Sequence, residues 1–70
     1  MNILELCLKD LVNQKTLLEG RLELVANDPL TANEIKFGKT MELLKEISTI
    51  QNLIGLTSMY ITQNKKEENN

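Results

Sequence analysis

An apolar repeat with alternating spacings of four and three residues runs through the first third of the chain. Its members are Leu4, Leu8, Leu11, Lys15, Leu18, Leu22 and Val25. At 100° per residue, these side chains share one face of an α-helix. The average spacing of 3.5 residues is the period at which two helices pack along their length. The repeat therefore predicts a long helix over residues 2–27 that packs against another helix.

A turn and a second helix are predicted directly after this repeat. Pro29 disfavours the α conformation at Asp28, so the first helix should end by Asn27. Thr31 and Glu34 have the spacing of a capping box, in which each side chain bonds the other residue's backbone amide. These signals predict a turn over residues 28–31 and a second helix over residues 32–62.

The apolar residues of the two segments predict a hairpin core. Its predicted members are Leu4, Leu8, Leu11, Leu18, Leu22, Val25, Phe37, Leu44, Ile47, Ile54 and Ile61, with Cys7 on the same apolar face of the first helix. Residues 63–70 have no apolar side chain and predict a disordered polar tail. The expected fold class is all-α, an antiparallel helical hairpin of two long helices within residues 1–62.

Two polar residues fall among the predicted core positions. Lys15 lies within the repeat of the first helix, and Gln51 has a similar place in the second. Polar residues at such positions can set the alignment and the partner of a helix pair, at some cost in stability. Alternatively, Lys15 buries its aliphatic stem and extends its ammonium group to the rim. The sequence leaves both interpretations open.

The chain has more apolar surface than one helix pair can cover. A chain of 70 residues with one cysteine has no internal disulfide, and such small chains often gain stability by oligomerisation. The surplus side chains predict a dimer or partner interface at Leu6, Leu17, Leu24, Met41, Leu53, Leu56 and Met59, with Ile3 beside them. We expect two hairpins to pair into a homodimeric four-helix bundle, or a different protein to cover this strip.

The letters Gly38-Lys39-Thr40 match the end of a phosphate-binding loop. That motif also needs a preceding strand and a glycine five positions before Gly38, where this chain has Asn33. The predicted cap places Gly38 inside a helix, where its amide bonds a backbone carbonyl. We therefore expect no nucleotide site, and we interpret Gly38 as a small residue where another helix approaches closely.

Composition argues against several other functions. The chain has no histidine and one cysteine, Cys7, so the common catalytic and zinc-binding sets are absent. Glu42 and Glu46 lie one turn apart but lack the Glu-x-x-His pair of a di-metal site. The net charge of −2, with lysines interleaved among glutamates, argues against a nucleic-acid-binding face. We expect no catalytic residues, no cofactor and no metal.

Hydropathy and the single thiol predict the setting of the protein. The apolar runs are far shorter than the ~20 residues of a membrane span, and the first ten residues lack the basic start of a signal peptide. We expect a soluble, cytoplasmic protein that is not an enzyme and has no membrane partner. The expected function is that of a small regulator or inhibitor, of the antirepressor, anti-defence or kinase-inhibitor type by analogy, which binds another protein through a helical face. The alternative is a structural subunit or adaptor in a larger protein assembly.

Overall fold

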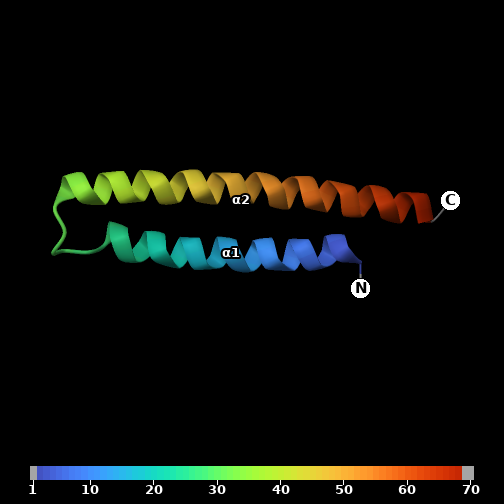
Figure 1. Ribbon diagram of the computed structural model, residues 1–70, viewed down its shortest axis with the longest axis horizontal. Coiled ribbons are helices and arrows are strands. Elements are labelled where there is room, and N and C mark those ends of the chain that lie inside the picture. The colour runs from blue at the N-terminus through green and yellow to red at the C-terminus, as the bar shows by residue number, and fades with distance from the viewer. Residues whose placement is uncertain (1, 69–70) are drawn as a thin grey trace.

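The computed structural model is an antiparallel hairpin of two α-helices (Figure 1). Helix α1 comprises Ile3–Ala26, and helix α2 comprises Asn33–Glu68. The structure describes the backbone of residues 2–68 and the side chains of residues 2–65. No strand occurs in this described part, so the expected all-α hairpin is confirmed. The molecule is a slender rod, with principal extents of 58 × 17 × 13 Å.

Asparagine side chains bond the backbone at both ends of α1. The side-chain oxygen of Asn2 accepts a hydrogen bond from the amide of Leu4 at 2.8 Å, which satisfies one of the free amides of the first turn. At the other end, the side-chain amide of Asn27 donates to the carbonyl of Glu23 at 3.0 Å. The bounds of α1 lie within one residue of the expected range of 2–27.

The turn between the helices is organised by Asp28 and not by the expected capping box. The Asp28 carboxylate accepts a hydrogen bond from the amide of Leu30 at 2.9 Å and another from the Thr31 hydroxyl. Thr31 thus bonds backwards to Asp28, and α2 begins at Asn33 with the amide of Lys36 bonded to the carbonyl of Ala32. The Thr31 hydroxyl thus donates to an ionised carboxylate three residues upstream, a bond that is stronger than one between neutral groups.

The same contacts hold the pKa of Asp28 below its ordinary value. The hydrogen bond from Thr31 has the largest effect, the bond from the Leu30 amide follows, and the positive charge of Lys36 adds to them. The stabilisation that this carboxylate provides is fully present above its ordinary pKa of 3.8. It is lost as the pH falls through the lower pKa of the folded chain.

Helix α2 continues beyond its expected end at residue 62. The structure is helical up to Glu68, so residues 63–68 are not the disordered tail that their polarity predicted. Glutamine, lysine and glutamate are good helix formers, and no glycine or proline lies in this segment to stop the helix. Residues 69 and 70, the rest of the predicted tail, lie outside the described residues.

The two helices meet along one continuous stripe on each, which we call the seam. On α1, the partly or fully buried residues are Leu4, Leu8, Leu11, Lys15, Leu18, Leu22 and Val25. On α2, the corresponding residues are Lys36, Thr40, Leu43, Ile47, Ile50, Ile54, Thr57, Ser58, Ile61 and Asn64. The alternating spacing of four and three residues therefore continues through both helices, as packing along a common axis requires.

Several predicted core positions are exposed in the structure. Phe37 is 70% exposed and Leu44 is 44% exposed, because each lies one residue after a seam position and projects to the side of it. Gln51 is also exposed, one residue after Ile50. Cys7 is an exposed free thiol at the edge of the α1 stripe. Lys15, in contrast, lies in the seam and is half-buried.

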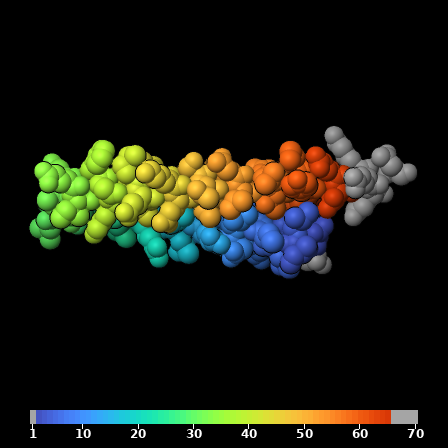
Figure 2. All heavy atoms as spheres, turned by 45° about the horizontal axis from the view of Figure 1, so that its top comes forward, coloured from blue at the N-terminus to red at the C-terminus, as the bar shows by residue number. Residues whose placement is uncertain are grey.

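The hairpin has a very small core. Among the described side chains, Leu18 is the one buried residue, at 9% exposure, and the other seam residues are half-buried. Half of the α2 seam is polar, with Lys36 and Thr40 near the turn and Thr57, Ser58 and Asn64 toward its far end. Figure 2 shows the two helices lying side by side, with side chains of both open on the face in view. Small chains with so little buried surface often depend on a partner chain for stability.

A candidate protein-binding surface

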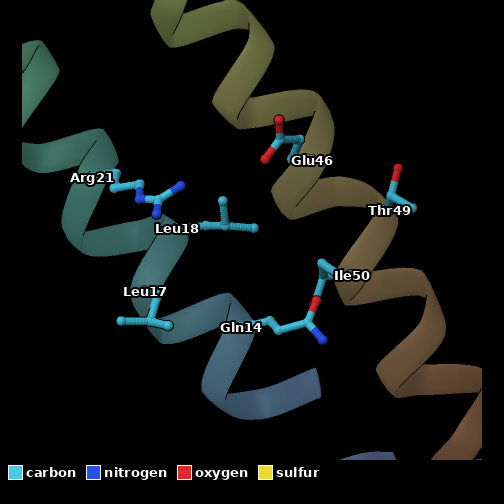
Figure 3. A pocket seen from close by; sticks show the side chains of 7 residues that line it. All are labelled: Gln14, Leu17, Leu18, Arg21, Glu46, Thr49 and Ile50. Carbon is cyan, nitrogen blue, oxygen red and sulfur yellow. The ribbon is translucent and has the colours of Figure 1, made fainter. Parts of the chain in front are cut away.

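Two adjoining hollows lie between the helices on one flat side of the hairpin. The first, of about 390 Å³, is lined by Gln14, Leu17, Leu18, Arg21, Glu46, Thr49 and Ile50 (Figure 3). The second, of about 310 Å³, lies nearer the turn and is lined by Arg21, Leu24, Val25, Lys39, Glu42, Leu43 and Glu46. Because Arg21 and Glu46 line both hollows, they form one shallow groove. We call this side of the hairpin the groove face.

The floor and the rim of the groove come from different positions of the helical repeat. Leu18 and Ile50 are seam residues, and Figure 3 shows the Leu18 side chain extending across toward α2. Leu17 lies one residue earlier on the rim and is 67% exposed, and Leu24, seven residues later, is 75% exposed. A shift of seven residues returns a side chain to the same side of a seam of this period. The rim of α1 is therefore apolar at both of these positions.

The same seven-residue shift extends the groove face along α2. Leu53 follows Glu46 by seven residues, and Leu56 follows Thr49 by seven, so both project on the groove side. Both leucines are exposed. The groove face therefore unites four of the predicted interface residues, Leu17, Leu24, Leu53 and Leu56.

The other predicted interface residues lie elsewhere, and all seven are exposed. Leu6 and Met59 fall opposite the seam on their helices, at 100° per residue. Met41 lies on the flat side opposite the groove, between two residues that we expected in the core. These two residues are Phe37 and Leu44. With Met41 they form a second exposed apolar surface, which we call the Phe37 strip.

The charges of the groove face balance near the turn. Arg21 and Lys39 supply two positive charges, and Glu42 and Glu46 supply two negative ones. Toward the middle of the hairpin, the lining changes to the uncharged residues Gln14, Thr49 and Ile50. The groove face therefore has no net charge near the turn and an apolar rim on α1.

Residues 2–65, whose side chains the structure describes, contain no group of three or more potential acidic, thiol or imidazole ligands that could hold a metal ion. Within the same residues, neither helix has an apolar stretch long enough to cross a membrane.

Gly38 lies within α2, and a β-carbon added to it would meet nothing within 4 Å. Our interpretation of this residue as a close approach between helices is therefore wrong. The helical backbone around the Gly38-Lys39-Thr40 triplet also lacks the loop in which several amides converge on a phosphate. The triplet has no phosphate-loop geometry.

We predict that Gly38→Ala stabilises the hairpin by about 0.5–1 kcal/mol, because alanine restricts the unfolded chain and meets open space in the helix. Thermal unfolding followed by circular dichroism measures this change.

Calorimetric titration of the wild-type protein with ATP or GTP and magnesium should show no heat of binding. A destabilised variant, or micromolar affinity for either nucleotide, would contradict the helical assignment of this triplet.

The protein was compared with protein-family models, with curated proteins and with solved structures, and none of them matches it.

Proposed function

We propose that this protein is a small non-enzymatic regulator or inhibitor that acts by binding another protein through a helical face, and that two copies pair into a four-helix bundle. One observation carries the proposal. Leu18 is the one buried residue among the described side chains, whereas fourteen large apolar residues are exposed. Since burying one leucine fully contributes ~1.5–3 kcal/mol, this hairpin gains most of its stability only when other surfaces cover it.

The Phe37 strip supports binding to a second kind of protein. Its three residues have the spacing i, i+4 and i+7 along α2, which is the pattern of apolar anchors that a helix inserts into a groove of its partner. Phe37 itself supplies a large aromatic side chain, and such residues are enriched among those that dominate binding. The strip is separate from the groove face, so one hairpin has room for both kinds of contact.

The proposed setting is the cytoplasm. The exposed and unpaired Cys7 suits a reducing compartment, where free thiols persist. The balanced charges of the groove face support a protein partner over a nucleic acid.

A structural subunit or adaptor in a larger assembly is the second candidate. The observation that favours it is the spread of the exposed apolar residues over both flat sides of the hairpin and the turn, where Leu30 is almost fully exposed. In such an assembly, neighbouring subunits would cover the apolar residues on every side of the hairpin.

Photo-crosslinking in the source cells tests the proposal. With p-benzoylphenylalanine in place of Phe37, we expect covalent adducts with one defined protein other than the chain itself. The same probe at the exposed Lys9 is the matched control and should give no such adduct. Adducts only between copies of the chain, or none, would refute the proposed binding function. Adducts with several subunits of one assembly, and no free chain in the lysate, would favour the structural role.

A further inference from the structure

The groove face of α1 carries two opposite charges. Arg21 lines both hollows, and Asp10 lies on the same side because it precedes Leu17, a lining residue, by seven positions. Both charged side chains are exposed. They are eleven residues apart, which is about 16 Å along the helix. A second copy of this face that runs in the opposite direction brings each arginine against an aspartate.

We propose that two copies of this chain pair through their groove faces, antiparallel to each other and related by a two-fold axis midway between Asp10 and Arg21. This inference rests on the proposed function, because it names a second copy as the occupant of one of the two apolar surfaces. It leaves the Phe37 strip free for a different partner.

The same two-fold axis brings together a second pair of α1 residues, one from each copy. Cys7 precedes Asp10 by three residues, and Leu24 follows Arg21 by three. The axis therefore places Cys7 of one copy against Leu24 of the other. Cys7 belongs to the groove face because it precedes the lining residue Gln14 by seven positions, and both partners of this contact are exposed.

On α2, the axis passes between residues 49 and 50. Its place follows from the first hollow, in which Gln14 and Leu17 of α1 lie across from Thr49 and Ile50 of α2. Leu53 then lies one helical turn from the axis, so the two copies of this leucine and of Leu17 lie near the centre of the interface.

The same axis also pairs polar groups on α2. Lys39, which lines the second hollow, and Tyr60 lie at equal distances on either side of this axis, so the Lys39 ammonium group of one copy faces the Tyr60 hydroxyl of the other and donates to it. Tyr60 is on the groove side because it follows Leu53 by seven residues, and it is half exposed in the single hairpin. Glu46 lies opposite Leu53 of the second copy, beside Arg21 of its own chain.

The available area suits such a dimer. The helices run side by side over about 36 Å, and two helices of ~10 Å width present on the order of 700 Å². A stable interface buries about 800 Å² per partner. The opposite flat side is a poorer candidate, because α1 presents there the charged residues Glu5, Lys9, Glu19 and Glu23. Three of these four are acidic, so the α1 part of that side is not self-complementary.

Disulfide mapping tests the orientation. In Leu24→Cys, oxidation with copper phenanthroline should join residue 24 of one copy to Cys7 of the other and give a covalent dimer on a non-reducing gel. The two thiols of a single chain are seventeen residues apart, about 25 Å along the helix, so they cannot bridge each other. The wild type, Leu24→Cys/Cys7→Ser and Lys9→Cys are the controls, and each should stay monomeric on the gel.

A charge exchange tests the pairing of Asp10 with Arg21. Arg21→Asp should weaken the dimer roughly tenfold or more in sedimentation equilibrium, because two attractive pairs become repulsive. Adding Asp10→Arg should restore the dimer. Three results would overturn the inference: a wild-type disulfide dimer, a non-covalent dimer without the cross-link between residues 7 and 24, or a monomer at micromolar concentration. Each leaves the crosslinking result at Phe37 untouched, so failure of this inference is distinguishable from failure of the proposed binding to another protein.

Discussion

Leu18→Glu is expected to unfold the chain, whereas Leu17→Glu, one residue earlier, should leave both helices formed. Leu18 is the one buried side chain among those described, and Leu17 is exposed on the rim of the groove. Full burial of a leucine contributes ~1.5–3 kcal/mol, and glutamate at this place adds the penalty of placing a charge between two apolar helices. A core of this size supplies only ~3–5 kcal/mol, so Leu18→Glu removes most of it.

Circular dichroism and sedimentation equilibrium together measure the difference. Leu18→Glu should lose most of the helical signal at 25 °C. Leu17→Glu should keep the helical signal but sediment as a monomer, because its charge falls at the centre of the proposed dimer. Thr16→Glu, on the exposed side of α1, is the matched control and should change neither quantity. Equal loss of helicity in Leu17→Glu and Leu18→Glu would show that the rim belongs to the core. Our separation of the seam from the groove face would then be wrong.

The first helix could be predicted from the sequence almost completely. It has an apolar residue at every seam position except Lys15, so the sequence allows only one choice of the face that packs against α2. Its end was also clear, because Pro29 disfavours the α conformation at Asp28. Leu17 and Leu24 could be assigned outside the seam for the same reason, since the main stripe left no place for them.

The second helix could not be predicted as well, because it carries two overlapping stripes. Leu43, Ile47, Ile50 and Ile54 follow the seam period, but Phe37, Met41 and Leu44 have a helical spacing of their own. Ranking residues by hydrophobicity selects Phe37 and Leu44. The structure selects Lys36 and Leu43 instead, because the seam must keep the same period as α1. Extending the period backwards from Ile47 and Ile54 would have identified these positions.

The groove face required the structure for a different reason. A helical projection shows which residues leave the seam, but it does not show which side of one helix lies beside which side of the other. The alignment of Leu17 with Thr49 depends on the length of the turn and on how Asp28 holds it. Neither can be read from the periodicity of either helix alone.

Lys15→Leu is expected to stabilise the hairpin by about 1–2 kcal/mol, which corresponds to a rise in Tm of roughly 4–16 °C for a chain of this size. Lys15 is half-buried in the seam, between Leu11 and Leu18. Ile50 lies across from this part of α1, since it lines the same hollow as Leu18. A leucine there would extend the apolar stripe without the partial desolvation of an ammonium group. Lys9→Leu, at an exposed position of the same helix, is the control and should shift Tm little.

The two interpretations of Lys15 differ in a second measurement. If the lysine sets the alignment of the helices, its loss makes the α1 stripe apolar at every position, so that α1 can pack in more than one alignment or exchange between chains. Sedimentation of Lys15→Leu would then show a mixture of masses together with the raised Tm. If Lys15 only extends its charge to the rim, the variant should gain stability and keep a single mass. A lowered Tm would contradict both interpretations, because it would mean that the ammonium group forms a stabilising contact in the paired protein.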